Sequence, residues 1–289
     1  MSKSTKQLVW FITGTSSGFG RELVKSAVAR GDLVIATARS LGKIQDFEHI
    51  ETVRTLQLDV TEGLSSIKAK VDQAAGYFGR IDVLVNNAGQ GFKTILEEGG
   101  SDVLREQFDV NFFGLIDVTN AVLPHMRSRR SGTIVHIGSR SNWSPEIPGI
   151  GAYASSKAAV RVYAETLNAE ISPFGIRSLI VEPGAFRTHS MDAQWSEGTR
   201  IAEYDEMRDA VKARLAAVEK AFRGDPAKAM ELLTDVVRGE GKAAGRPWQL
   251  YLPIGGAAID AISGKARKMI EVVDGWGDVV ASGLNMDEA

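Results

Sequence analysis

The chain has 289 residues, of which 44% are hydrophobic and 24% charged, and its formal net charge is −2. This length suits one large α/β domain over residues 1–289 and is ample for a hydrophobic core. The small net charge argues against a nucleic-acid-binding protein, and the absence of cysteine excludes disulfides, thiolate catalysis and cysteine-based metal sites. The four histidines are scattered and never paired at helical ligand spacing, so no metal site is expected.

The N-terminal region carries no pattern for targeting or membrane insertion. Only five apolar residues precede Thr13, which is too short for the apolar core of a signal peptide. No stretch anywhere reaches the roughly 18 apolar residues that a membrane-spanning helix needs. We therefore expect no membrane span and a cytoplasmic location.

Short apolar runs alternate with longer helical patterns along the chain, which predicts crossover units and a mostly parallel sheet with helices on both faces. Strands are expected near Leu8–Thr13, Leu33–Ala38, Val53–Leu58, Val83–Asn86, Thr133–Ile137, Ile176–Val181 and Trp248–Leu252. Helices are expected near Gly20–Arg30, Glu62–Phe78, Asp102–Met126, Ala152–Ser172, Ile201–Phe222 and Pro226–Val237. The predicted fold class is α/β, with a doubly wound, seven-stranded sheet.

Two segments are predicted to lie outside this layered core. The stretch after the sixth strand, about 186–222, lacks an early strand pattern and is expected to fold over a ligand as a lid. The chain beyond Gly255, about 256–289, is expected to be a helical extension with apolar positions such as Ile259, Met269 and Trp276. We expect this extension to pack against the same core.

A glycine-rich segment, Thr13–Gly20, joins the first predicted strand to the first helix. Glycine lets the backbone approach a pyrophosphate closely, and the N-terminus of the helix supplies free N–H donors at the positive end of its dipole. This arrangement predicts a dinucleotide phosphate site; the alternative is a strand-to-helix turn without a ligand.

Tyr153 and Lys157 lie four residues apart in a predicted helix, so their side chains point the same way. A neighbouring ammonium favours the phenolate and lowers the pKa of a tyrosine from about 10, which would let Tyr153 exchange a proton near neutral pH. The spacing alone is weak evidence, because exposed helices often carry it by chance. However, Ser139 and the segment Asn86–Gly89 each follow a predicted strand, at the edge where open α/β sheets bind ligands. Asn111 lies in a mostly apolar helical stretch, where a buried amide needs a partner.

Together these motifs resemble the short-chain dehydrogenase/reductase family, in its compact branch. Thr13–Gly20 matches the family's Thr-Gly-x-x-x-Gly-x-Gly motif, and Asn86–Gly89 its Asn-Asn-Ala-Gly motif. Tyr153 and Lys157 match Tyr-x-x-x-Lys, and Pro183–Thr188 matches Pro-Gly-x-x-x-Thr. The resemblance covers at least residues 8–190 and implies a Rossmann-type fold.

The resemblance also implies roles for four residues. Tyr153 would exchange a proton with the substrate oxygen, and Lys157 would lower the pKa of Tyr153 and hold the nicotinamide ribose. Ser139 would bind the substrate oxygen, while Asn111 would hold a water in a proton relay. Ser139 lies fourteen residues before Tyr153, one more than the family's usual spacing, which a one-residue insertion explains; Ser141 is the alternative serine.

The end of the second predicted strand bears on the choice of cofactor. An enzyme that selects NAD usually has a carboxylate there, whereas this chain has Ala38 followed by Arg39 and Ser40. A guanidinium suits the 2′-phosphate of NADP by charge and geometry. We therefore predict NADP(H), with NAD(H) as the alternative; Asp59 resembles the family's adenine-contacting acid, or caps the following helix. The predicted cofactor-binding residues are Gly14, Thr15, Ser16, Ser17, Gly18, Phe19, Gly20, Arg39, Ser40, Asp59, Val60, Asn87, Ala88, Gly89, Tyr153, Lys157, Pro183, Gly184, Phe186 and Thr188.

The predicted substrate pocket is largely aromatic and apolar, which favours a hydrophobic ketone or aldehyde and its alcohol. Its predicted walls are Phe92, Arg140, Trp143, Ile147, Phe186, Met191 and Trp195. The resemblance implies a homodimer or homotetramer, paired through helices matching Asp102–Met126 and Ala152–Ser172. Two other functions stay open: a non-catalytic NADP-binding sensor or scaffold, and a sugar-nucleotide epimerase or dehydratase, which usually has a differently spaced glycine motif.

Overall fold

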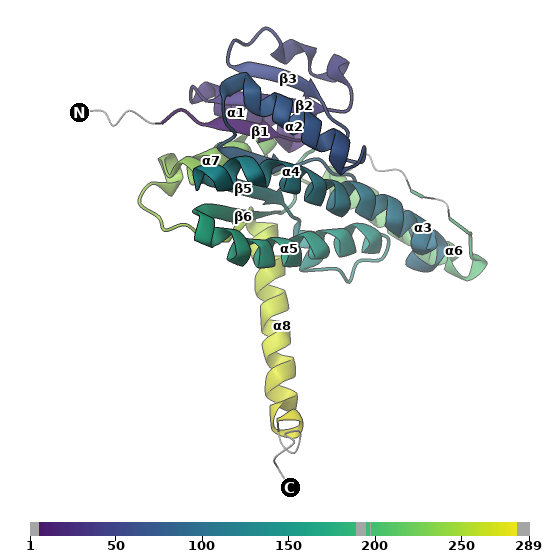
Figure 1. The fold of residues 1–289 in the computed structure, drawn as a ribbon. Coiled ribbons are helices and arrows are strands. Elements are labelled where there is room, and N and C mark those ends of the chain that lie inside the picture. Colours follow the sequence, from purple (N-terminus) through teal and green to yellow (C-terminus); the bar gives the residue numbers. More distant parts are fainter. Residues whose placement is uncertain (1–5, 189–194, 197, 282–289) are drawn as a thin grey trace.

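A seven-stranded parallel sheet runs through the computed structural model, which describes residues 6–188, 195, 196 and 198–281 (Figure 1). The strand order is β3-β2-β1-β4-β5-β6-β7, so the chain reverses its direction of winding between β1 and β4. The strands are β1 (Val9–Ile12), β2 (Leu33–Ala38), β3 (Val53–Gln57), β4 (Val83–Asn86), β5 (Gly132–Ile137), β6 (Ile176–Pro183) and β7 (Tyr251–Ile254). This is the expected Rossmann-like sheet, and ligands bind such sheets beyond the carboxyl ends of the strands at the point of reversal.

The helices are α1 (Gly18–Ala29), α2 (Leu64–Phe78), α3 (Leu96–Phe108), α4 (Gly114–Arg129), α5 (Gly151–Ile171), α6 (Asp205–Lys220), α7 (Pro226–Arg238) and α8 (Gly256–Val280). The single helix expected at Asp102–Met126 is in fact α3, a π-helical turn η3 (Asp109–Phe113) and α4. Within α3, Gly100 leaves helical geometry with φ 55° and ψ −158°, a conformation that glycine tolerates. The last strand also begins later than expected, at Tyr251 rather than Trp248.

Both faces of the sheet are covered by helices. Trp10 and Ile12 of β1 point to the face packed by α1 and α7, whereas Val9 and Phe11 point to the face packed by α2, α4 and α5. All four side chains are fully buried. A strand covered on both sides has no polar face, which is why its sequence is apolar without alternation.

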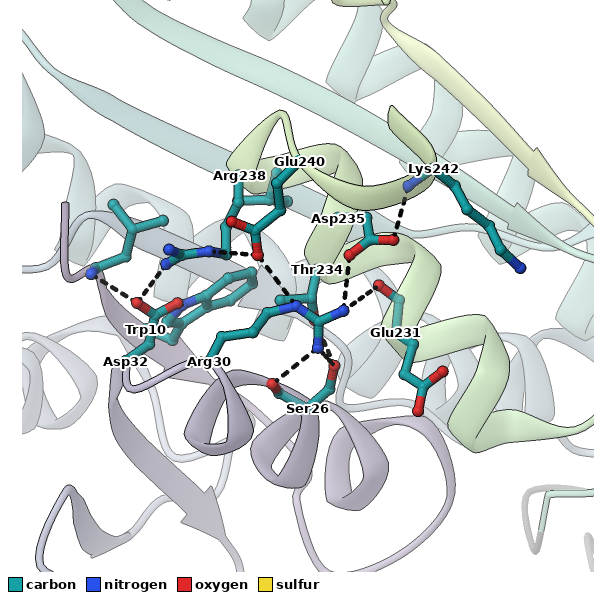
Figure 2. Close-up of polar contacts among 12 residues, drawn as sticks. Trp10, Ser26, Arg30, Asp32, Glu231, Thr234, Asp235, Arg238, Glu240 and Lys242 are labelled. Atoms are coloured by element: carbon teal, nitrogen blue, oxygen red, sulfur yellow. Dashed lines mark hydrogen bonds and ion pairs between the residues drawn. The ribbon is translucent and has the colours of Figure 1, made fainter. Parts of the chain in front are cut away.

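Ion pairs link the C-terminal end of α1 and the turn after it to α7 (Figure 2). Asp32, which is fully buried, accepts from the Trp10 indole at 2.8 Å and pairs with Arg238 at the end of α7. Arg30 of α1 pairs with Asp235 of α7 at 2.7 Å. These contacts fix the layer of helices that covers one face of the core.

The predicted lid region contains α6, which lies beside α3 (Figure 1). Arg208 of α6 is buried and pairs through its guanidinium with Glu98 of α3, where Nε lies 2.9 Å from Oε2. Glu98 also accepts from the backbone N–H of Ile201, and Arg208 pairs with Asp205 as well. A buried, hydrogen-bonded pair therefore holds this part of the region against α3.

The expected packing of the C-terminal extension against the core is wrong for most of its length. The first turns of α8 lie on the body, where Ala258 and Ala261 are buried. Beyond Lys265 and Lys268, whose side chains still approach Glu146 of the body, the helix projects away from the sheet (Figure 1). Val273 and Trp276 are 62% and 61% exposed. Neither α8 nor any other helix in the described ranges is long and apolar enough to cross a membrane.

Candidate active site

The glycine-rich loop is held in place by the end of β4. Asn87 donates from its side chain to the backbone oxygens of Thr13 and Gly14, at 2.8 and 3.0 Å. The hydroxyl of Thr13 in turn accepts from the backbone N–H groups of Asn87 and Ala88. A Cβ at Gly20 would lie 2.4 Å from the Gly14 oxygen, so a side chain cannot fit there. The side-chain N–H groups of Asn87 are therefore used to shape the loop.

A cavity of about 390 Å³ lies at the N-terminus of α1 and includes Ser16, Ser17 and Gly18 of the loop. Its lining also includes two cations, Arg21 and Arg187, and one anion, Glu22. Gly18 has φ 55°, and a Cβ there would touch Thr188 at 3.5 Å. Glycine backbone, helix N–H groups and cationic side chains fit the phosphates of a dinucleotide.

Other predicted cofactor-binding residues have packing or hydrogen-bonding partners within the protein. Phe186 packs edge-on against Phe19 with ring centroids 5.4 Å apart, which joins the start of the lid to α1. Pro183 ends β6, and Gly184 donates its backbone N–H to the Ile254 oxygen. Thr15 is buried and donates to the Thr37 oxygen of β2.

Tyr153 and Lys157 lie one turn apart on α5 and face the segment after β4. A Cβ on Gly91 would lie 3.4 Å from the Tyr153 ring, and one on Gly89 would lie 3.6 Å from Lys157 Nζ. Lys157 donates to the Ile137 oxygen at 2.7 Å, and its Nζ lies 5.9 Å from the centre of the Tyr153 ring. The two side chains thus meet at the carboxyl ends of β4 and β5.

The expected lowering of the Tyr153 pKa is wrong. Burial of the phenol raises the pKa of Tyr153, and its hydrogen bonding with Ser139 offsets this only in part; the charge of Glu182 raises it further. Burial lowers the pKa of Lys157 to about 8, against an opposing effect of Glu182. Tyr153 is therefore a neutral phenol at neutral pH, which suits a proton donor.

The structure puts Ser139, rather than Ser141, against the Tyr153 phenol. Ser139 is buried at the end of β5, and its hydroxyl accepts from the Ser141 backbone N–H at 3.1 Å. The short helix η4 (Arg140–Asn142) follows at once.

Sequence reasoning missed Glu182, a fully buried acid at the end of β6. Its Oε2 accepts from the Ser139 backbone N–H at 2.6 Å and from the Asn142 amide at 3.0 Å. Burial raises the pKa of Glu182 to about 6, and the nearby Trp143 indole lowers it, although no well-aligned hydrogen bond forms between them. The available signal was an acidic residue directly after the apolar run Leu179–Val181.

Asn111 lies in the π-helical turn η3, a local geometry that often marks functional sites. Its side chain exchanges hydrogen bonds with the backbone of Gln90 and donates to Ser156 at 3.0 Å. The side-chain amide of Asn111 thus links the segment after β4 to α5. Gln107, which sequence reasoning also missed, is buried and braces the same segment through Gln90 and Phe92.

The end of β2 presents Arg39 and Ser40 as exposed side chains. The Arg39 backbone is held by Gln57 of β3. Burial acts to raise the pKa of Asp59, but its hydrogen bonds from Thr61 and, to a smaller extent, the charge of Arg39 lower it. Asp59 binds Thr61 rather than capping α2, whose N-cap is Gly63. Val60 is buried against Gly114.

The residues predicted to line the substrate pocket lie in different parts of the structure. Trp195 pairs with Lys93 in a short parallel bridge and lies against Gly149, so it closes over the segment after Phe92. Trp143 packs against Arg161 and Tyr251, which gives it a structural role between α5 and β7. Arg140 and Ile147 are half-buried. Met191 lies outside the described residues, and within them no three His, Asp or Glu side chains group as metal ligands.

Comparisons with known proteins agree with this geometry. A family model described as short chain dehydrogenase matches residues 8–199. The 3-ketodihydrosphingosine reductase of Bacteroides thetaiotaomicron is 40% identical over 181 residues, which are 63% of this chain and 65% of that protein, just under two thirds of its length. A short-chain dehydrogenase structure from Streptomyces avermitilis superposes with a TM-score of 0.81 at 34% identity, over 95% of this chain and 98% of that one.

Solved structures of the same fold bind NAD or NADP. ElxO with NADP bound, for example, superposes with a TM-score of 0.69 at 22% identity, over 88% of this chain and all of that one (100%). At this identity the likeness concerns the fold alone.

Proposed function

This chain belongs to the short-chain dehydrogenase family of oxidoreductases, and from that premise we propose that it interconverts a hydrophobic ketone or aldehyde and its alcohol with NADP(H). The observation that carries the proposal is the meeting of Ser139, Tyr153 and Lys157 beside Gly89 and Gly91, at the same sheet edge as the glycine-rich loop. A nicotinamide dinucleotide, when bound, supplies or accepts the hydride.

The residues around the loop fit such a dinucleotide. Ser16, Ser17 and Gly18 would hold its phosphates at the N-terminus of α1, together with the nearby Arg21 and Arg187. Lys157 would hold the ribose next to the nicotinamide. These assignments are supported by the cavity and by the absence of space for a side chain at Gly14 and Gly20.

In this proposal Tyr153 is the general acid for carbonyl reduction. Its raised pKa keeps the phenol protonated at neutral pH, so the O–H can pass its proton to the developing alkoxide. Ser139 donates a hydrogen bond to the same oxygen and so stabilises its charge. In the reverse reaction Tyr153 would act as the phenolate, which takes the proton from the alcohol and becomes the phenol again.

The preference for NADP(H) is proposed from Arg39. It directly follows Ala38, which occupies the strand end where a carboxylate would bind the ribose of NAD, and its exposed guanidinium can pair with a 2′-phosphate. Ser40 adds a hydroxyl beside it. Asp59 and Val60 are assigned to the adenine.

The substrate class is proposed from the apolar walls around Tyr153. Phe92 adjoins Gly91 on one side, and Trp195 closes over Lys93 and Gly149 on the other. The relative named as a 3-ketodihydrosphingosine reductase acts, by its name, on a ketone of a sphingoid base, which agrees with an apolar substrate.

We also propose a dimer or tetramer that pairs through α4 and α5. Two large apolar side chains support it, Phe113 just before α4 and Val162 on α5, which are 53% and 51% exposed.

The test is consumption of NADPH, and separately of NADH, with a panel of hydrophobic ketones and aldehydes. Tyr153→Phe should keep NADPH binding, followed by tryptophan fluorescence, and lose turnover by roughly 100-fold or more, the contribution of a general acid. Tyr163→Phe is the matched control, because Tyr163 lies on α5 but packs against Phe112 and His136. Full turnover by Tyr153→Phe would refute the role of Tyr153 as the general acid. If the wild type and both variants bind NADPH but none turns over any substrate, a non-catalytic NADP-binding sensor would be favoured.

Arg39→Ala tests the choice of cofactor in the same assay. It should raise KM for NADPH and leave KM for NADH unchanged, since only NADPH carries the 2′-phosphate. Arg54→Ala is the control, because Arg54 lies on β3 over the ring of Phe78. A wild-type preference for NADH would overturn the cofactor assignment and leave the catalytic one intact.

A further inference from the structure

The projecting part of α8 exposes more apolar surface than a solitary soluble helix should. Eight large apolar side chains along it are about half exposed or more: Ile259, Met269, Ile270, Val272, Val273, Trp276, Val279 and Val280. Monomeric soluble proteins rarely expose a contiguous apolar patch above a few hundred Å². The helix has 25 residues and is therefore about 37 Å long, and only its first turns lie on the body.

The apolar residues of α8 follow the spacing of a helix that packs against another helix. Intervals of three and four residues connect Ile259, Ile262, Ala266, Met269, Val273, Trp276 and Val280. This is the heptad pattern of a coiled-coil seam. Ile270, Val272 and Val279 flank the seam and widen it. The pattern continues well past the turns that the body covers, so it is suited to a partner outside this copy.

Beyond Asp260 in its first turns, the charges on α8 are divided along its length. Lys265, Arg267 and Lys268 lie in the middle of the helix, whereas Glu271, Asp274 and Asp278 lie in its last part. Two of the cations also approach Glu146 of the body, at 3.7 Å for Lys265 and 3.9 Å for Lys268. A parallel copy of the helix would put like charges side by side, whereas an antiparallel copy would put the basic part beside the acidic part.

The same charges speak against a lipid surface as the partner. A helix that lies on an anionic membrane carries Lys and Arg along its polar face. Here the last part of the helix, which holds Trp276, is flanked by Asp274 and Asp278 and has no cation.

We propose that α8 pairs antiparallel with α8 of a second copy of this chain. Centred near Glu271, the pairing sets the large Trp276 of one copy opposite the small Ala266 of the other, and Met269 opposite Val273. The exposed halves of the seven large side chains between Met269 and Val280 amount to several hundred Å² per copy, on the order of the ~800 Å² that one partner gives a stable interface. The pairing is separate from the α4–α5 contact and does not depend on the proposed chemistry.

The first test is the mass of the full chain in solution by light scattering at micromolar concentration. The double variant Val273→Glu, Trp276→Glu should halve the mass of the wild-type assembly, because it puts charges into the seam. Both side chains are more than half exposed, so the body should keep its melting temperature. Gly275→Glu is the matched control on the polar face, where a Cβ meets nothing within 4 Å, and should leave the mass unchanged. A monomeric wild type, or a double variant of unchanged mass, would overturn the pairing.

The second test measures direction, and it is simple because the chain has no cysteine. Oxidation should cross-link the variant Val272→Cys, since the two Val272 residues lie near the centre of an antiparallel pair. It should not cross-link Val280→Cys, whose copies would be about 27 Å apart along the helices. Cross-linking of Val280→Cys would indicate a parallel pair and reject the proposal. Sedimentation of the wild type, but not of the double variant, with phosphatidylserine vesicles would reject it in favour of a lipid surface.

Discussion

At the scale of single residues, we expect Glu182 to influence catalysis without contacting the substrate. Its buried carboxylate accepts from the Ser139 backbone and from Asn142, and so positions the serine hydroxyl next to Tyr153. Its charge also raises the pKa of Lys157 against the effect of burial. Glu182 is therefore a positioning residue with an electrostatic effect that can be measured separately.

Glu182→Gln should lower kcat by roughly 10- to 100-fold, because the amide turns N–H groups toward donors and displaces Ser139. Without the negative charge the pKa of Lys157 falls further below about 8, so the alkaline decline of the pH–rate profile should move to lower pH. The measurement is the pH profile of kcat beside Glu165→Gln, an acid on α5 that binds Arg161 instead. A slower variant with an unshifted profile would reduce Glu182 to a structural role.

Ion pairs also join the end of α1 and the turn after it to α7. Asp32 is fully buried between them and depends on Arg238 for its counter-charge, while its other contacts are to Leu8 and Trp10. A buried carboxylate that loses its partner cannot regain water.

Arg238→Met should accordingly destabilise the protein by about 3–5 kcal/mol in urea unfolding. Adding Asp32→Asn to the same chain should restore much of that loss, because the uncompensated charge disappears. Lys25→Gln, which breaks the exposed Lys25–Glu22 pair within α1, is the control and should cost at most about 1 kcal/mol. A loss as small as that of the control would mean that water reaches Asp32.

For the whole molecule, the buried His136 should make stability depend on pH. Burial and the charge of Lys157 lower the pKa of His136 from 6.5 to about 3. Between those values the unfolded chain binds a proton that the folded chain does not, so stability is full above pH 6.5 and falls as the pH drops. Glu182 acts in the opposite direction, because its pKa is raised from 4.5 to about 6 and the folded chain protonates first.

His136→Gln isolates the histidine contribution. Between pH 7 and pH 5 the wild type should lose about 2 kcal/mol more unfolding free energy than the variant, measured in urea at each pH. Glu182 is present in both chains and cancels in the difference. Equal losses in the two chains would show that His136 titrates normally.

The layered fold could be anticipated because its pattern is local. Strands such as β2 (Leu33–Ala38) are apolar throughout and bounded by turns, and that is enough to indicate a sheet covered on both faces. The break between α3 and α4 was missed because a π-helical turn keeps helical periodicity in the sequence. The free α8 was missed because an apolar stripe looks the same whether it faces a core or another molecule.

In the candidate site, too, some features could be predicted from local sequence, whereas others depend on the tertiary structure. The glycine-rich loop and the Tyr153–Lys157 spacing are readable from short segments, since glycine and helical periodicity act within a few residues. The environment of these groups depends on residues far apart in the chain. Glu182 reaches Ser139 across 43 positions, and the burial it shares with Tyr153 sets the direction of the phenol's pKa. Residue types along the chain thus specified the elements and the chemical groups, whereas packing between distant segments set their partners and charges, because desolvation and hydrogen bonding arise only where those segments meet.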